Sequence, residues 1–180
     1  MSGLKRTPLY EMHIKYGGMI VDFGGWELPV RDKGKGDLEE HRTVREAVGL
    51  FDVSHMGEIR VKGPATLKFV DNLITNDVAG AEMNQVTYAQ MCYPEGGIVD
   101  DLLAYKLSDE EFCLVVNASN SDKDFEWIRK QAEGWDCTVV NESAAWAEIA
   151  VQGPKAQELV QRLTDYNLDE LKFFYCMENV

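Results

Sequence analysis

Two adjacent aspartates, Asp100 and Asp101, interrupt the apolar segment GGIVDDLLAYKL, whose composition is otherwise typical of a β-strand. Asp is disfavoured in strands, and burying a carboxylate is costly unless the group is paired or hydrogen-bonded. Successive strand residues face opposite sides, so Asp101 shares a face with Tyr105 while Asp100 shares the other with Lys106. We therefore expect the two carboxylates not to act as one pair.

Asp101 is the better candidate for a carboxylate at the wall of a binding pocket. Its face is the more apolar one, with Tyr105 as the only other polar tip, and ligand pockets are mostly apolar with a few placed polar groups. The alternative is that one aspartate caps a turn and the other forms a salt bridge. A DD pair is a weak signal, so the residues alone leave both interpretations open.

Two further polar side chains stand at strand ends. His55 lies in DVSHMG, a polar interruption between apolar segments, where irregular backbone often places functional groups; the alternative is a hydrogen-bonded structural histidine. Asn117, at the end of CLVVN, offers an amide donor and acceptor that suit the edge of a heterocycle, or it caps the following helix.

His13 and His41 fall on expected helices and are interpreted as surface or core-edge residues. The aromatic residues Trp26, Tyr88 and Tyr105 are core residues by default.

The composition argues against two classes of partner. The formal net charge is −13, whereas binding to nucleic acid or to an anionic membrane needs a basic footprint. We therefore expect no nucleic acid and no membrane, and a small molecule or a protein as the partner. The sequence contains no P-loop, GxGxxG, HExxH or GxSxG motif and no Cys/His set with metal spacing, so we expect no metal.

The cysteines and the N-terminus predict a cytoplasmic location. The four cysteines show no C-x-x-C spacing and are interpreted as reduced structural thiols. The start MSGLKRTPLYEMH lacks an apolar signal core and an Arg/Ser-rich transit pattern, and no run approaches the roughly 20 apolar residues of a membrane span.

Helix and strand signals alternate along the chain. Helices are expected after Thr7-Pro8, from Asp37 through Val48, after Pro64, and after Ser121, which would form a capping box with Asp124. The expected strand segments are MIVDFGGWELPV, LFDVSHMGEIRVKG, QVTYAQMCY, GGIVDDLLAYKL and FCLVVNA, with YPEGG as a tight turn. This pattern predicts an α+β fold of antiparallel sheets with flanking helices.

A short pattern occurs twice. Val61 to Pro64 and Val151 to Pro154 each end a strand in a Gly-Pro turn before an amphipathic helix, which indicates two similar, interleaved subdomains. The final LKFFYCMENV reads as an apolar strand that stops without a turn or cap. We therefore expect the chain to be cut rather than finished, and expect an unpaired apolar edge that promotes self-association.

Several segments together resemble the aminomethyltransferase family, the T proteins of the glycine cleavage system. They are TPLYEMH, MIVDFGGWELPV, VREAVGLFDVSHMGEIRVKGPATLKFVDNLITNDV, GGIVDDLLAYKL, VVNASNSDKDFEWI and VQGPKAQELVQRL. The resemblance runs in register from about Thr7 to the last residue, and its GLFDVSHMG and GGIVDDL segments are specific. It implies the folate-binding aminomethyltransferase-like fold, incomplete at its C-terminus. In this interpretation residues 1–55 with 145–180 are parts of a first, folate-binding subdomain, and 56–144 form a second α+β subdomain.

The resemblance also implies an activity and a site. Family members transfer a one-carbon unit from the aminomethyl-lipoyl group of the carrier H protein to tetrahydrofolate, which releases ammonia and forms methylene-tetrahydrofolate. By resemblance, Asp101 is the essential acidic residue beside the pterin, which agrees with its assignment to the more apolar face. The residues that fall where the family lines its folate pocket are Met56, Tyr88, Tyr105, Val116 and Asn117.

Length is the main departure from the family, whose members are about twice as long. The later half of those enzymes contributes further acidic and arginine contacts to folate, so the chain by itself is expected to be inactive. The loop RDKGKG also differs from the more apolar family connection. Two alternatives remain open: a non-catalytic folate-binding module, and a protein of the same fold that serves iron-sulfur assembly or demethylation.

Overall fold

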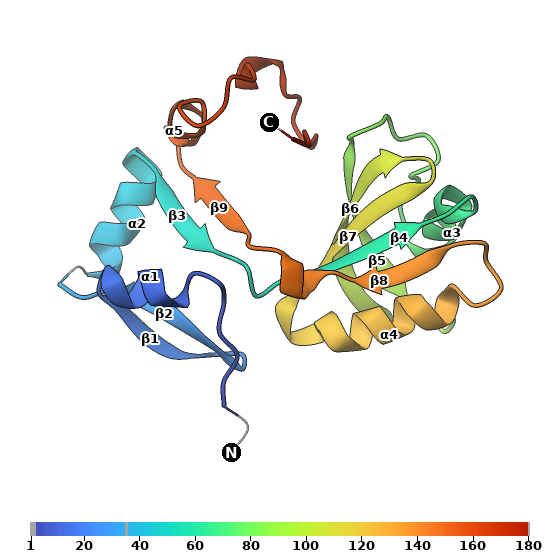
Figure 1. Ribbon diagram of the computed structural model, residues 1–180, viewed down its shortest axis with the longest axis horizontal. Coiled ribbons are helices and arrows are strands. Elements are labelled where there is room, and N and C mark those ends of the chain that lie inside the picture. Colours follow the sequence, from blue (N-terminus) through green and yellow to red (C-terminus); the bar gives the residue numbers. More distant parts are fainter. Residues whose placement is uncertain (1–2, 35, 180) are drawn as a thin grey trace. The chain divides into compact units, whose positions relative to one another are not determined.

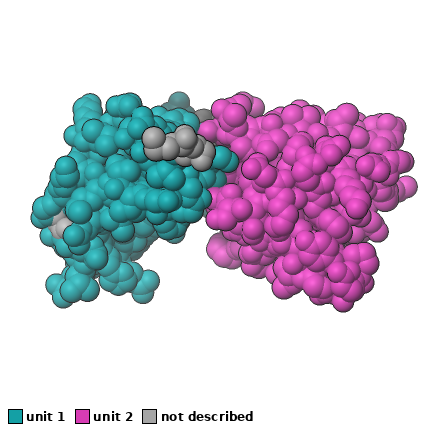
Figure 2. All heavy atoms as spheres, turned by 90° about the horizontal axis from the view of Figure 1, so that it is seen from below, with its two compact units in different colours: residues 1–55, 147–170, 180 teal, residues 56–146, 171–179 magenta. Residues whose placement is uncertain are grey.

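The computed structural model describes residues 3–34 and 36–179, which divide into two compact units (Figure 1, Figure 2). Unit 1 combines the described parts of Met1–His55 with Ala147–Glu170, and unit 2 combines Met56–Trp146 with Leu171–Asn179. Each unit is therefore assembled from segments that lie far apart in the sequence. Helices and antiparallel strands occur in both units, which confirms the predicted α+β class.

Unit 2 is built on a five-stranded antiparallel sheet with the strand order β5-β6-β7-β4-β8. Two consecutive hairpins form β5 to β7, whereas β4 comes earlier in the chain and lies between β7 and β8. The elements of this unit are β4 (Gly57–Lys62), α3 (Thr66–Leu73), β5 (Val86–Cys92), β6 (Ile98–Ser108), β7 (Glu111–Val116), the short 3-10 helix η1 (Ala118–Asn120), α4 (Ser121–Gln131), β8 (Thr138–Asn141) and η2 (Ser143–Ala145).

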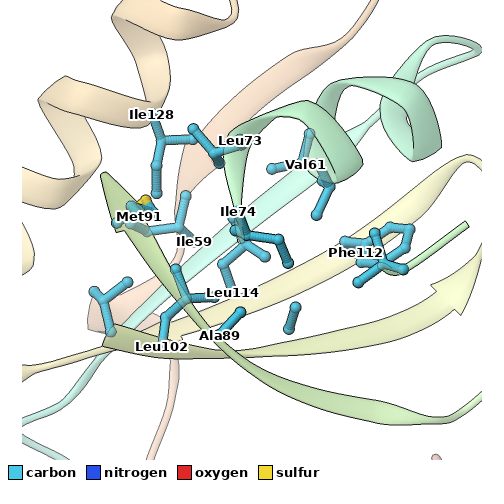
Figure 3. Packing of buried hydrophobic residues seen from close by; sticks show 14 of the residues in the cluster. Ile59, Val61, Leu73, Ile74, Ala89, Met91, Leu102, Phe112, Leu114 and Ile128 are labelled. Carbon is cyan, nitrogen blue, oxygen red and sulfur yellow. The ribbon is translucent and has the colours of Figure 1, made fainter. Parts of the chain in front are cut away.

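The hydrophobic core of unit 2 lies between helices α3 and α4 and one face of this sheet (Figure 3). Ile59, Leu102 and Leu114, from three neighbouring strands, are at most 3% exposed. Phe69 of α3 and Ile128 of α4 are fully buried in the same cluster. Because burial of apolar surface is the main favourable term in folding, this contact fixes the sheet and leaves its other face for a different use.

Unit 1 contains two smaller antiparallel pairs, β1 with β2 and β3 with β9. The first pair is a hairpin in which the Asp22 carboxylate accepts a hydrogen bond from the backbone N–H of Gly25 at 2.9 Å. The elements of this unit are α1 (Tyr10–Lys15), β1 (Gly18–Phe23), β2 (Trp26–Asp32), α2 (Asp37–Glu46), β3 (Gly49–Asp52), β9 (Ile149–Gln152), α5 (Ala156–Val160) and η3 (Leu168–Glu170).

The repeated Gly-Pro turn has the same structural role in both units. Gly63 and Gly153 have φ values of 139° and 120°, which disfavour any side chain. A Cβ on Gly63 would lie 2.6 Å from the backbone carbonyl oxygen of Asp136, and a Cβ on Gly153 would lie 2.5 Å from that of Ala47. Each of these oxygens also accepts a hydrogen bond from the backbone N–H two residues after the glycine, at 3.1 and 2.9 Å. In each unit the turn thus fixes the start of a helix against a distant segment.

Strand β6 contains a bulge at its start. Met91 pairs with Asp100 while the next residue, Cys92, pairs with Ile98, so Val99 is an extra residue in the ladder. A bulge of this kind breaks the alternation of side chains, and Val99 and Asp100 are both buried, at 6% and 7% exposure. The bulge thus brings Val99 inward, whereas Asp100 lies on the core face with Leu102 by regular alternation and the next residue, Asp101, lies on the open face.

Several local expectations are wrong. The segment LFDVSHMGEIRVKG is not one strand: it forms β3 and β4, which belong to different units. Ser121 and Asp124 form no capping box, because α4 begins at Ser121 and Asp124 is fully buried. Thr7 does not cap α1, since its hydroxyl donates to Asp52 at 2.6 Å.

The C-terminal segment is also not a strand. It contacts the rest of unit 2 through an isolated antiparallel bridge between Tyr175 and Gln85, beside the start of β5, and through Lys172 and Tyr175, which both contact the Glu82 carboxylate. The backbone N–H of Val86 donates to the carbonyl of Phe174 at 2.8 Å. Leu171–Asn179 therefore belongs to unit 2, whereas the sequence interpretation groups it with the first subdomain.

Among the described residues, none of the helices is both long enough and apolar enough to cross a membrane.

Candidate functional site

Asp101, Tyr88 and Tyr105 lie on the open face of the five-stranded sheet. Asp101 pairs with Gln90 of β5 and Tyr88 pairs with Leu103 of β6, so Tyr88 and Asp101 are diagonal neighbours on one face. Tyr105 follows further along the same face and pairs with Cys113 of β7. Tyr88 is 48% exposed, and Asp101 and Tyr105 are partly exposed. Three of the residues predicted from the sequence therefore share one accessible surface.

The Asp101 carboxylate is held by two hydrogen-bond donors. The Tyr88 hydroxyl donates to Asp101 Oδ2 at 2.6 Å, and Asn117 Nδ2 donates to Asp101 Oδ1 at 2.9 Å. Asn117 Nδ2 also lies 3.2 Å from the backbone carbonyl oxygen of Asp101. Donors on both oxygens fix the orientation of the carboxylate before any ligand arrives, which is how a binding site is preorganised.

The same asparagine connects the two aspartates. Asn117 Nδ2 donates to Asp100 Oδ1 at 3.0 Å as well as to Asp101. The two carboxylates face opposite sides of the sheet, as the alternation predicts, but they share Asn117 as a donor. Since Asn117 follows β7 and precedes η1, its side chain reaches the start of β6, where Asp100 and Asp101 follow the bulged residue Val99. The side chain of Asn117 orients carboxylates here and does not cap the following helix.

The pKa values of this cluster follow from its contacts. Burial by itself would raise the pKa of Asp100, but hydrogen bonds with Asp124, Asn117 and Asn120 outweigh burial and hold that pKa below its ordinary value. The hydrogen bond that Tyr88 donates to Asp101 raises the pKa of the phenol, because the carboxylate stabilises the protonated form. The open face therefore presents a neutral phenol beside a carboxylate.

Behind Asp100 lies a residue whose role the sequence interpretation missed. Asp124 of α4 is fully buried, and its Oδ1 accepts a hydrogen bond from Lys123 Nζ at 2.9 Å. Lys123 Nζ also donates to the backbone carbonyl of the bulged residue Val99. A signal was present in the sequence: Asp124 precedes the apolar Ile128 by four positions, and residues at this spacing share a helix face.

Two predicted pocket residues differ in their surroundings. Val116 is fully buried in the core cluster and pairs with Leu102, so its side chain faces α3 and α4 rather than the surface that carries Asp101. Met56 is partly buried and comes directly before β4, whose first residue, Gly57, pairs with Val116. Val116 thus supports the site from beneath, and Met56 lies at the end of the sheet near Asn117.

The histidines belong to unit 1 and to other networks. His13 Nε2 lies 2.7 Å from Asp52 Oδ2, whose carboxylate also accepts hydrogen bonds from Thr7 and Ser54. Burial would raise the pKa of Asp52, but these hydrogen bonds lower it below its ordinary value. His55 packs edge-on against Phe23 and Trp26, and burial lowers its pKa. His41 is exposed on α2.

Metal ligands are not clustered in the part of the chain that the structure describes: no three His, Cys, Asp or Glu side chains come together there in a way that could hold a metal ion. The four cysteines are free thiols. The chemistry that the cluster around Asp101 offers is hydrogen bonding and electrostatic stabilisation.

The comparison with protein families decides the relationship. The family model described as the GCVT N-terminal domain matches residues 9–179. The chain belongs to this family. Its Asp101 cluster lies entirely within the matched residues.

Relatives of the family cover the whole chain. An aminomethyltransferase of Alkaliphilus oremlandii is 54% identical over 180 residues, which are 100% of this chain and 48% of that protein. An aminomethyltransferase of Thermoanaerobacter sp. is 52% identical over 180 residues, again 48% of its length. The chain thus spans about half the length of the curated relatives it matches.

A solved structure shows the same fold. The glycine cleavage system aminomethyltransferase T of Bartonella henselae superimposes with a TM-score of 0.86 at 35% sequence identity. The match covers 96% of this chain and 46% of the Bartonella protein. This agreement confirms the aminomethyltransferase-like fold expected from the sequence.

Proposed function

We propose that the open face of unit 2 binds the pterin of a reduced folate, and that the protein takes part in aminomethyl transfer from a lipoylated carrier protein to tetrahydrofolate. The observation that carries the proposal is the Asp101 carboxylate, held on both oxygens by Tyr88 and Asn117 on an accessible sheet face. Membership in the GCVT N-terminal domain family supports it, as do relatives named aminomethyltransferase that are 54% and 52% identical to this chain.

The reaction needs positioning and charge stabilisation rather than a metal. A nitrogen of tetrahydrofolate forms a bond to the aminomethyl carbon as the bond from that carbon to ammonia breaks. A second folate nitrogen then displaces the lipoyl sulfur, which leaves as a thiol. The two nitrogens lose two protons, of which the leaving amine takes one and the sulfur takes the other. Positive charge develops on the attacking nitrogen and the transferred carbon, so a fixed carboxylate nearby lowers the barrier.

Each residue of the site has a separate part in this proposal. Asp101 accepts a hydrogen bond from the pterin and stabilises the developing charge, while Tyr88 and Asn117 keep it oriented. Tyr105 and Met56 supply apolar surface for the ring at the two ends of the site, and Val116 supports the site through the core. Asp101 acts mainly through its position, because Tyr88 and Asn117 hold both of its oxygens.

The partners in this proposal are the lipoylated H protein and the reduced folate. We also propose a cytoplasmic location, because the four cysteines are free thiols and such thiols persist in reducing compartments.

The test uses a chimera in which this chain replaces the matching 180 residues of the Alkaliphilus oremlandii relative. We expect release of ammonia from aminomethylated carrier that depends on tetrahydrofolate, at a rate comparable to that of the unmodified relative. The unmodified relative is the positive control, and the chimera without tetrahydrofolate is the negative control. A folded chimera without turnover would contradict the proposed transfer.

Calorimetry of the 180-residue chain, combined with turnover of the chimera, distinguishes a binding module from an enzyme. A folate-binding module gives heat with tetrahydrofolate in calorimetry, and its chimera with the relative shows no turnover. We expect heat at up to millimolar ligand together with turnover in the chimera. No heat at millimolar tetrahydrofolate would contradict both interpretations.

A further inference from the structure

Two buried carboxyl groups face each other beneath Asp101. Asp124 of α4 is 0% exposed and Asp100 of β6 is 7% exposed. One oxygen of each has a donor: Asn117 donates to Asp100 Oδ1 at 3.0 Å, and Lys123 donates to Asp124 Oδ1 at 2.9 Å. Within the described chain, the other oxygens, Asp100 Oδ2 and Asp124 Oδ2, are buried and receive no N–H or O–H group.

The two side chains are nevertheless in hydrogen-bonding contact with each other. Ionised carboxylates only accept hydrogen bonds, so two of them cannot form this contact. One proton between the two groups removes the conflict, because the oxygen that carries it becomes a donor, the other orphaned oxygen accepts its hydrogen bond, and the buried negative charge is halved. A pair of carboxylates that share one proton is the arrangement that the geometry requires.

We propose that Asp124 is a positioning residue that holds this proton and donates it to Asp100, and so fixes Asn117 and, through Asn117, the Asp101 carboxylate. The effect on catalysis rests on the proposed function, whereas the protonation itself does not. The contacts form a continuous chain from the helix to the open face. Asp100 accepts from both Asp124 and Asn117, and the same amide nitrogen lies 2.9 Å from Asp101 Oδ1.

The surrounding groups decide which carboxyl group carries the proton. Asp100 receives hydrogen bonds from the amide groups of Asn117 and Asn120, which favour its ionised form whichever carboxyl group carries the proton. Asp124 faces Asp100 across the contact and Lys123 on its own helix; burial and then the Asp100 contact raise its pKa to about 7, against the opposing effect of Lys123. Asp101 and Tyr88 lie on the far side of the sheet. Asp124 is therefore the protonated partner below about pH 7.

Deprotonation of Asp124 would remove the contact that holds Asp100 and Asn117 in place. Two adjacent buried anions repel each other, so Asp100 would lose the hydrogen bond from Asp124 that fixes its orientation. Asn117 would then no longer be held between Asp100 and Asp101. The rate of aminomethyl transfer is thus expected to fall as the pH rises above about 7. The group that titrates is the buried Asp124, which does not contact the ligand.

The test compares three variants. Asp124→Leu removes the donor, Asp124→Asn keeps a donor but cannot titrate, and Asp122→Asn is the matched control because Asp122 is exposed on the same helix. In the chimera at pH 7, we expect Asp124→Leu to lower the transfer rate at least tenfold, and Asp124→Asn to restore it to within about threefold. Above pH 8, Asp124→Asn should decline less than the parent, a change in pH profile that a purely structural role would not cause.

Infrared spectroscopy of the 180-residue chain tests the proton without any activity. The C=O band of a protonated carboxyl group should be present at pH 6 in the parent and in Asp122→Asn, fade as the pH rises through about 7, and be absent from Asp124→Asn. The variant comparison is needed because burial also raises the pKa of Glu148, in unit 1.

Two results would overturn the inference. An unchanged protonated-carboxyl band in Asp124→Asn would show that Asp124 carries no proton. Equal losses of rate in Asp124→Asn and Asp124→Leu would show that the proton donor does not position the site. A parent chimera without turnover would instead contradict the proposed function, and the infrared comparison would still decide the protonation. If Asp124→Leu does not fold, Asp124→Asn and the infrared band remain decisive.

Discussion

At the scale of single residues, the structure assigns Asp101 and its neighbours to one accessible face. The alternation of a strand was sufficient to separate Asp101 from Asp100. The residues alone indicated Asn117 as a candidate, and the resemblance added Tyr88. The link between the two aspartates could not be predicted, because it depends on the side chain of Asn117, which reaches both carboxylates from the end of another strand. Side-chain contacts between distant segments are a property of the fold and are not contained in a local pattern.

Tyr88→Phe tests the preorganisation of Asp101. The substitution keeps the ring and removes the hydroxyl that donates to Asp101 Oδ2 at 2.6 Å. A hydrogen bond to a charged group contributes roughly 1.5–3 kcal/mol, so we expect the chimera to lose about tenfold or more in transfer rate. Tyr16→Phe, at a side chain that is 67% exposed in unit 1, is the control. Equal rates for both variants would show that the Tyr88 hydroxyl does not position Asp101.

Asp124→Asn should also change how stability depends on pH. The folded chain holds the Asp124 proton up to about pH 7, whereas the unfolded chain releases it near 3.8, so the folded state binds more protons in that window. The free energy of unfolding of the parent should therefore fall, relative to that of Asp124→Asn, as the pH rises from about 4 to about 7.

Urea denaturation at pH 5 and pH 8 measures this difference, which should be on the order of 2 kcal/mol. Asp100 has a lowered pKa and contributes in the opposite direction, stabilising the fold above its unfolded pKa, but it is present in both proteins and largely cancels. A stability difference that is independent of pH would argue against a raised Asp124 pKa.

At the scale of elements, period and turn signals predicted most helices and strands. They failed where tertiary contacts override a local signal: Thr7 bonds to Asp52 instead of capping α1, and Asp124 faces Asp100 instead of completing a capping box. One apolar segment also divides into β3 and β4, since the polar Ser54-His55 turn carries the chain from one unit to the other. The repeated Gly-Pro turn, in contrast, was visible in the sequence and has the same role in both units.

Gly63→Ala tests that turn. The new Cβ would lie 2.6 Å from the carbonyl oxygen of Asp136, at a φ of 139°. Gly134→Ala is the matched control, because Gly134 has a φ of 86° with open space around its Cβ position. The unfavourable φ costs about 1–3 kcal/mol at either site, so the further destabilisation of Gly63→Ala in urea denaturation reports the steric overlap. A smaller loss of stability in Gly63→Ala than in the control would refute this role.

At the scale of the whole molecule, the chain spans about half the length of its relatives and exposes several large apolar side chains. Phe173 is 88% exposed and Leu163 is 80% exposed. The sequence predicted an apolar edge strand at residues 171–177, whereas the structure shows an irregular segment with one bridge. Exposed apolar surface remains a basis for association even without a strand edge.

We expect the 180-residue chain to self-associate when expressed alone and to show no aminomethyl transfer without the remainder of a family member. Light scattering checks the first statement and an ammonia-release assay checks the second. Phe173→Ser should lower the scattering mass without changing the stability of the fold, because that side chain is almost fully exposed. A monomeric chain with turnover would contradict the expectation.

The most direct test of the account is the transfer rate of the Asp101→Asn chimera relative to the parent chimera. Asparagine keeps the shape of the side chain and removes the charge that the proposal places beside the reacting nitrogen. Removal of a key electrostatic group typically lowers the rate by about 10²–10³, so we predict less than about a hundredth of the parent rate, with Asp122→Asn unchanged. An Asp101→Asn rate above roughly a tenth of the parent rate would contradict the role of Asp101.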